Sequence, residues 1–394
     1  MTAFTRDHGL IDLILHDPTI ANVYVGNVST TWMADCVPHD GFLADFLTIN
    51  RGFRMNAIPS VTNVVAREAQ KMSNYALLFA PADVSHDMTD MQSLYRRCES
   101  VRQRFDAISH VSGRPVDELL LIKQPAVAIS RMELISLGLA AGMLGISDEI
   151  QREHGDPVCA GGVSLGELVA LAASGSISLQ DLVEIIKLRQ DLPQDLSHEE
   201  AVGFLVLPPE QDLTYYTSTN FVSVAVDYGP SKNGAARLVM LSGEKKSLED
   251  LATGGPGSLE ILPQSLCKAA HHNPHRWWIR NDIDQKLRID HFQTPKFPIV
   301  SCLDNSAPLT DKFSVREGIL RTETEGLSLE NLKRGFLASN LKIIRAVGPF
   351  FRSIRLNFGV PFTFTTKFGL LTKIWFGTTC RHRNERKRLD HARH

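Results

Sequence analysis

The sequence predicts an α/β fold with a core parallel sheet and a smaller α+β subdomain inserted into it. Three observations predict this. Short apolar strands alternate with helices between residues 74 and 200, as in successive βα units. Between residues 201 and 263 the pattern changes to that of consecutive strands. The chain of 394 residues then returns to a buried strand at residues 295–305.

The core begins with one strand and two helices. NYALLFA (residues 74–80) predicts a short buried strand that ends at Pro81. Apolar residues at helical spacing predict a helix over residues 91–111. A second, strongly apolar helix is expected over residues 125–145, with Pro125 in its first turn because proline is tolerated there.

A strand, a glycine-rich turn and two more helices follow. DPVCAGG (residues 156–162) predicts a strand that runs into glycines. LGELVALAASG predicts a helix that Gly175 ends, since glycine favours helix C-termini. SLQDLVEIIKLRQDL predicts the next helix, with Ser178 as its N-cap.

The inserted subdomain is predicted from β-branched and aromatic enrichment in its strands. The segments AVGFLVL, FVSVAVDYG and ARLVMLSGE predict three strands, KSLEDLA a short helix and SLEILP a further strand. PKFPIVSCLDN at residues 295–305 predicts the strand with which the chain returns to the core.

The two ends of the chain carry weaker signals. Residues 1–73 match no motif and are predicted to be an N-terminal extension of unknown role. Residues 331–394 hold 14 Lys or Arg against only Glu385 and Asp390, and they are rich in aromatic residues. A separate C-terminal segment is therefore expected, most simply a tail without a stable fold. The alternative is that this segment docks on an acidic partner protein or on an anionic membrane. Of these two, the membrane is the less favoured.

Composition argues against several other classes of protein: metal-binding, membrane-spanning, secreted and nucleic-acid-binding. The six cysteines show no metal-ligand spacing, which indicates buried reduced thiols in a cytoplasmic protein. No apolar run is long enough to span a membrane, and the N-terminus lacks the apolar core of a secretory signal. The net charge is −2, and no nucleic-acid partner is expected.

The strongest chemical signal is Gly162-Val163-Ser164-Leu165-Gly166, which reads G-x-S-x-G between a strand and a helix. A nucleophilic serine at such a sharp turn needs small flanking residues, and the helix behind it stabilises an oxyanion. The pattern by itself is equally consistent with a tight turn that performs no chemistry.

The segments around this serine resemble the malonyl-CoA:acyl carrier protein transacylase family of fatty acid and polyketide synthesis. They are, in order, ALLFAPADVSH, QPAVAISRMELI, GVSLGELVALAASGSISLQDLVEIIKLRQDL, AARLVMLSGEKKSLEDLA, HHNPH and PKFPIVS. The resemblance covers roughly residues 74–310. It implies a hydrolase-like core from residues 74–200 and 264–330, and a ferredoxin-like subdomain at residues 201–263.

The resemblance also implies two catalytic residues. Ser164 would attack an acyl thioester and hold the acyl group as an ester. His272 would take the serine proton and later activate the acceptor thiol, with His271 as the fallback base. A solvated polar loop is the alternative for this histidine cluster. His271 also stands where the family has a phenylalanine associated with acyl-group selectivity, so the acyl group is expected to be unusual.

Three further residues complete the implied site. Arg189 stands where the family's arginine binds the free carboxylate of malonyl, the alternative being a helix-surface arginine near Asp191. The backbone N–H groups of Leu165 and Asp83 would form the oxyanion hole. Asp83 replaces a glutamine, and Val163 replaces the histidine that usually precedes the nucleophile.

The implied function is ping-pong transfer of a malonyl-type group from coenzyme A to the phosphopantetheine thiol of an acyl carrier protein. Malonyl-CoA or a related acyl-CoA is the substrate, and no metal or tightly bound cofactor is expected. A thioester hydrolase on the same fold is one alternative. A catalytically degenerate scaffold is another, because the oxyanion loop is altered and the family's usual C-terminal element is not recognisable.

Overall fold

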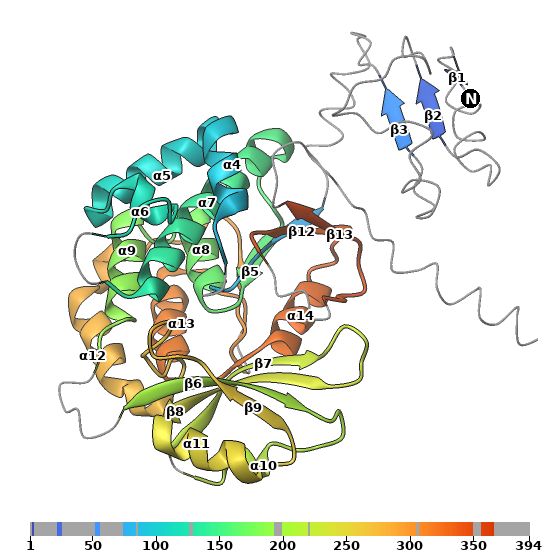
Figure 1. Cartoon of the computed structure of the whole chain (residues 1–394). Helices are drawn as coiled ribbons and strands as arrows, with labels where there is room; N and C mark the ends of the chain where they lie inside the picture. The colour runs from blue at the N-terminus through green and yellow to red at the C-terminus, as the bar shows by residue number, and fades with distance from the viewer. Residues whose placement is uncertain are drawn as a thin grey trace, which may run out of the picture. The chain divides into compact units, whose positions relative to one another are not determined.

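The computed structural model of the chain divides into two units, Met1–Ala69 and Gln70–His394. The described part comprises three short N-terminal strands and residues 74–83, 86–125, 129–192, 199–219, 221–304, 307–349 and 356–365 (Figure 1). In the first unit β1 (Thr2–Ala3), β2 (Asn22–Val25) and β3 (Gly52–Met55) pair in parallel in that order. The role of this unit remains unassigned.

A five-stranded parallel sheet forms the centre of the second unit. Its order is β10-β5-β4-β12-β13, and every neighbouring pair is parallel. The strands are β4 (Tyr75–Phe79), β5 (Cys159–Gly162), β10 (Ile299–Val300), β12 (Ile343–Val347) and β13 (Phe362–Thr365). All of β4 is buried, as expected for a parallel strand covered on both faces. The predicted parallel-sheet core is confirmed.

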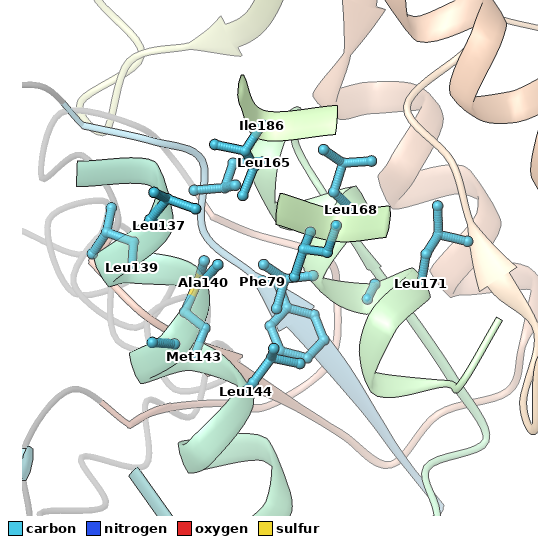
Figure 2. Close-up of a cluster of buried hydrophobic side chains, with 14 of the residues drawn as sticks. Phe79, Leu137, Leu139, Ala140, Met143, Leu144, Leu165, Leu168, Leu171 and Ile186 are labelled. Atoms are coloured by element: carbon cyan, nitrogen blue, oxygen red, sulfur yellow. The ribbon is translucent and has the colours of Figure 1, made fainter. Parts of the chain in front are cut away.

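Helices cover both faces of this sheet. On one face lie α4 (Thr89–Arg97), α5 (Glu99–Ser112), α6 (Val116–Leu119), α7 (Arg131–His154), α8 (Leu165–Ala173) and α9 (Leu179–Leu188). Figure 2 shows Phe79 of β4 lying between apolar side chains of α7, such as Leu144, and those of α8, such as Leu168. On the opposite face α14 (Leu329–Ala338) packs against Ala76 and Leu78.

Two predicted helices have different bounds in the structure. The helix expected over residues 91–111 is two helices, because Cys98 has an extended backbone conformation that separates α4 from α5. The helix expected over residues 125–145 begins only at Arg131 and continues to His154. No proline or glycine marks the division at Cys98 in the sequence, whereas Gly155 directly follows the end of the second helix.

The inserted subdomain has the predicted elements and one more. The predicted ones are β6 (Glu200–Leu207), β7 (Val222–Pro230), β8 (Arg237–Glu244), α11 (Lys245–Gly254) and β9 (Ser258–Ile261), and the short helix α10 (Thr214–Thr217) was not predicted. These four strands are antiparallel in the order β7-β8-β6-β9, which with two crossover helices is the ferredoxin-like β-α-β-β-α-β arrangement. The short strand β11 (Leu327–Ser328), from the core, extends the sheet beside β7.

The chain returns to the core through short elements. These are the 3-10 turn η1 (Pro274–Arg276), α12 (Trp277–Lys286), the 3-10 turn η2 (Ile289–His291), β10 and α13 (Lys312–Thr324). Asp311 caps α13 through its side chain, which accepts from the backbone N–H groups of Phe313 and Ser314.

The predicted boundary at residue 331 is wrong. Residues on both sides of it form one helix, α14, and β12 lies between β4 and β13 inside the core sheet. The apolar strand is short, so the charge of the surrounding basic residues concealed it in the sequence. The predicted tail beyond residue 365 lies outside the described residues.

Two predictions about composition can be compared with the structure. Within the described part of the chain, no helix is both long and apolar enough to cross a membrane. Cys98, Cys159, Cys267 and Cys302 are free and buried, as expected, whereas the remaining two cysteines lie outside the described residues.

Candidate active site

Ser164 lies at the turn between β5 and α8, in a strained conformation. Its φ is 56° and its ψ is −108°, a region that residues other than glycine rarely occupy. The flanking glycines make this turn possible. A Cβ atom at Gly162 would lie 2.4 Å from the backbone of Gly166, and one at Gly166 would lie 2.3 Å from the Phe79 carbonyl oxygen. The local G-x-S-x-G pattern therefore determines where the serine points.

Replacing Gly166 by alanine is expected to destabilise the protein by about 1–3 kcal/mol, the usual cost of overpacking a filled site. The added methyl group would meet backbone atoms of Phe79 that cannot rotate away. Thermal unfolding measures the loss. The control is Gly254→Ala, where the nearest atom is the tip of the Tyr215 side chain, which can rotate away. Equal melting temperatures for Gly166→Ala and the parent would contradict the close approach.

His272 lies against Ser164 although 108 residues separate them. Its Nε2 is 2.8 Å from the Ser164 Oγ, and its Nδ1 is 2.5 Å from the Thr322 carbonyl oxygen. A carbonyl only accepts hydrogen bonds, so Nδ1 carries the proton and Nε2 is left as an acceptor. Burial, and then the charge of Arg189, lowers the pKa of His272 to about 4. The neutral imidazole is thus the form present near pH 7.

Arg189 follows the last residue of α9 and is buried, only 6% exposed. The alternative of a helix-surface arginine is therefore wrong. Its Nε and Nη2 donate to Oε1 of Glu323 at 2.8 and 2.6 Å, and Nη2 also donates to the Thr322 hydroxyl at 3.2 Å. Arg276 donates to the Arg189 carbonyl oxygen and holds its main chain.

All six residues predicted for the site line one cavity of about 330 Å³, which lies where the core meets the subdomain. They are Asp83, Ser164, Leu165, Arg189, His271 and His272. The other side chains of the lining are mainly apolar, with Met132 and Ile186 from the core and Phe204 and Met240 from the subdomain. The arrangement can therefore place an acyl chain among apolar groups beside a serine hydroxyl paired with a base.

His271 contributes a second imidazole to the cavity. Its Nε2 is buried and has no hydrogen-bond partner among the described residues. Burial, followed by the charge of Arg276, places the pKa of His271 well below its usual range. It is therefore a neutral group in the cavity that contains Ser164, and the structure pairs His272 rather than His271 with the serine.

The two proposed oxyanion donors differ in their surroundings. Leu165 is the first residue of α8, where backbone N–H groups and the helix dipole favour negative charge. Asp83 borders the same cavity, and its carbonyl oxygen accepts a bond from the His86 N–H at 3.0 Å. Residues 84 and 85 lie outside the described part, and the oxyanion hole stays a prediction.

Three residues of the site were not predicted. Two of them lie at the end of α13: the Thr322 carbonyl accepts from His272, and the Glu323 carboxylate accepts from Arg189. The alternating Thr and Glu residues there do not indicate these contacts in the sequence. Glu167 is buried and accepts bonds from the Ser301 hydroxyl and the Cys302 N–H, which ties α8 to the end of β10. Burial raises the pKa of Glu167 to about 7. In the sequence, the position of Glu167 one helical turn after Ser164 was the only indication that it belongs to the site.

Curated proteins that resemble the chain are polyketide synthases. Polyketide synthase GfsB of Streptomyces halstedii is 25% identical over 248 residues, 62% of this chain. The spectinabilin polyketide synthase system protein NorC of Streptomyces orinoci is 26% identical over 200 residues, 49% of this chain. The matches span 4% and 8% of the lengths of these two proteins. No protein-family model matches the chain.

Solved structures with the same fold include malonyl transferases. The malonyl-CoA:ACP transacylase of Synechocystis sp. PCC 6803 has a TM-score of 0.61 at 15% identity, covering 75% of this chain and 98% of its own. The acyl carrier protein S-malonyltransferase of Vibrio cholerae has a TM-score of 0.57 at 19% identity, covering 70% and 90%. A type II polyketide malonyl-transacylase solved with its acyl carrier protein, AntF, has a TM-score of 0.61 at 19% identity, covering 75% and 96%. The resemblance predicted from the sequence is confirmed at the level of the fold: this chain has the fold of the malonyl-CoA:acyl carrier protein transacylases.

Proposed function

We propose that this protein is a cytoplasmic acyltransferase of fatty acid or polyketide synthesis. It moves a malonyl-type acyl group from coenzyme A to the phosphopantetheine thiol of an acyl carrier protein. The observation that carries the proposal is the alignment of Ser164, His272 and the Thr322 carbonyl at the head of α8. The free buried cysteines support a reducing compartment.

The reaction has two halves. In the first, Nε2 of His272 takes the proton of Ser164 while Oγ attacks the thioester carbonyl; the carbon–sulfur bond breaks, and coenzyme A leaves as a thiol with that proton. In the second, the same nitrogen takes the proton of the carrier thiol, whose sulfur attacks the acyl-serine ester. The ester bond breaks, and the proton returns to the serine oxygen.

Stabilisation of the oxyanion is assigned to the backbone N–H groups of Leu165 and Asp83. Leu165 is favoured by its place at the start of α8. We assign selectivity for the acyl group to His271, because it lines the cavity and its buried Nε2 has no partner among the described residues. Arg189 is assigned to the acyl carboxylate because its guanidinium borders the same cavity.

Acyl-enzyme formation should depend on pH with a low midpoint. Only neutral His272 can accept a proton, so the rate falls as pH falls through its pKa of about 4, not through the ordinary value of 6.5. We expect nearly constant rates from pH 7 down to pH 5.5. Stopped-flow acylation over pH 4–8, with near-UV circular dichroism to monitor folding, measures this. A half-maximal rate near pH 6.5 in folded protein would contradict the geometry.

The experiment that tests the function is intact-protein mass spectrometry after brief incubation with malonyl-, methylmalonyl- and acetyl-CoA. We expect a mass increase of one acyl group on the parent, which addition of holo acyl carrier protein removes by transfer. Release of coenzyme A without a lasting adduct, and without acylated carrier, would indicate a thioester hydrolase. No adduct and no release from any donor would indicate a scaffold.

A further inference from the structure

The guanidinium assigned to the substrate's carboxylate already holds a carboxylate of this chain. Glu323 is 4% exposed and lies against Arg189 with contacts of 2.6 and 2.8 Å to a single carboxylate oxygen. Arg189 directly follows α9 and lines the cavity that contains Ser164, whereas Glu323 belongs to α13 and is not among the lining residues. Glu323 therefore acts on the cavity through Arg189.

Hydrogen-bond geometry shows which N–H groups of Arg189 remain available to a substrate. A guanidinium has five N–H hydrogens, and a bidentate grip on a carboxylate uses two neighbouring nitrogens. Glu323 takes the Nε hydrogen and one from Nη2, and the Thr322 hydroxyl takes the other from Nη2. Among the contacts of the described residues, Nη1 is the nitrogen of Arg189 that remains available to a ligand. A malonyl carboxylate therefore cannot be gripped bidentately while Glu323 stays in place.

Electrostatics also disfavours a malonyl carboxylate at Arg189 while Glu323 stays in place. Arg189 and Glu323 neutralise one another inside the protein, where desolvation makes an uncompensated charge costly. A second carboxylate at Arg189 would have to share that guanidinium with Glu323. An uncharged acyl group meets no such repulsion, and the apolar lining of the cavity favours it.

We propose that Glu323 is a specificity-determining residue, an internal competitor for Arg189. It makes the resting site accept acyl groups without a free carboxylate, such as acetyl or propionyl, and a malonyl carboxylate must displace it. This inference rests on the proposed acyl transfer through Ser164. It concerns the class of acyl group rather than the chemistry.

The surroundings of Glu323 restrict the displacement to its side chain. The Asn273 N–H donates to the Glu323 carbonyl oxygen at 3.2 Å, and the Asn273 amide is itself bound to Ser242. The main chain is therefore held while the carboxylate rotates. Arg276 offers a second cation: it is 2% exposed, the charge of Glu323 acts on it, and its Nε has no hydrogen-bond partner among the described residues.

The parent protein gives the first test, without any substitution. Stopped-flow acylation of Ser164 by malonyl-, acetyl- and propionyl-CoA yields a second-order rate constant for each donor. We expect the three constants to agree to within about tenfold, since a bidentate charge-assisted pair formed only by malonyl would separate them by more. A malonyl preference above about tenfold would overturn the inference.

The Glu323→Gln variant tests the competition directly. Glutamine keeps the size and one acceptor oxygen but not the charge, so Arg189 becomes available. We expect the ratio of the malonyl constant to the acetyl constant to rise about tenfold, the gain of one charge-assisted pair. The control is Glu325→Gln, a nearby carboxylate that pairs with Arg321 away from the cavity.

Two results on this variant would overturn the proposal. A fall in malonyl acylation with acetyl unchanged would mean that Glu323 positions Arg189 for the substrate instead of competing with it. Equal changes for both donors would mean a purely structural role. If thermal unfolding shows that the variant does not fold, the donor ratio of the parent decides alone. A parent that no donor acylates would instead refute the proposed function itself.

Discussion

Replacing Ser164 by alanine will abolish the acyl-enzyme and reduce acyl transfer by roughly 10⁴-fold or more, the scale seen when a catalytic nucleophile is removed. The hydroxyl is the group to which His272 is hydrogen-bonded at 2.8 Å, and alanine leaves that imidazole with nothing to deprotonate. The fold should be unaffected, because alanine has the same Cβ in the same strained turn. Loss of activity with an unchanged melting temperature is the expected result.

Intact mass after incubation with each acyl-CoA, together with carrier acylation rates, measures this loss. The matched control is Ser218→Ala, which removes an exposed hydroxyl whose contact is the Tyr215 carbonyl. The control should acylate like the parent. An acyl adduct on the Ser164→Ala protein of the same size and rate as on the parent would place the nucleophile elsewhere.

Ending the chain after Ala338 is expected to prevent folding. The cut removes β12, whose neighbours in the sheet are β4 and β13, and with it Ile344, Ala346 and Val347, which are fully buried. Without β12, strand β4 would have an open edge in the middle of the core and expose the apolar side chains that packed on it. The loss should exceed the marginal stability typical of domains, about 5–15 kcal/mol.

Circular dichroism and limited proteolysis of the truncated chain measure this outcome. The comparison is a chain ending after Thr365, which retains every element that the structure describes. A cooperative thermal transition in the chain ending at Ala338, at the temperature of the longer form, would show that β12 is dispensable.

Local constraints explain why the sharp turn at Ser164 could be predicted. The turn at Ser164 needs small residues at Gly162 and Gly166, and those two letters are visible in the sequence. His272 was identified only through the resemblance, because nothing local to it indicates which serine it meets. Its pairing depends on the path of the chain through the subdomain and back.

Long-range contacts explain why Glu323 and strand β12 could not be predicted from the sequence. Glu323 lies in a stretch of alternating Thr and Glu, a pattern typical of a solvated helix end, and acidic residues are seldom buried unless paired. Its partner Arg189 is 134 residues away in the sequence. Strand β12 was missed for a related reason, since five residues within a basic stretch carry too little pattern to indicate a place in the core.

The position of β12 also affects the synthesis of the protein. The ribosome completes β4 at Phe79, but the strand that must pair with it ends at Val347. At about 5–20 residues per second, β4 waits on the order of ten to fifty seconds for this neighbour. During that interval a fully apolar strand presents an unpaired edge, a template for aggregation. The nascent chain is thus expected to need a chaperone until β12 has emerged.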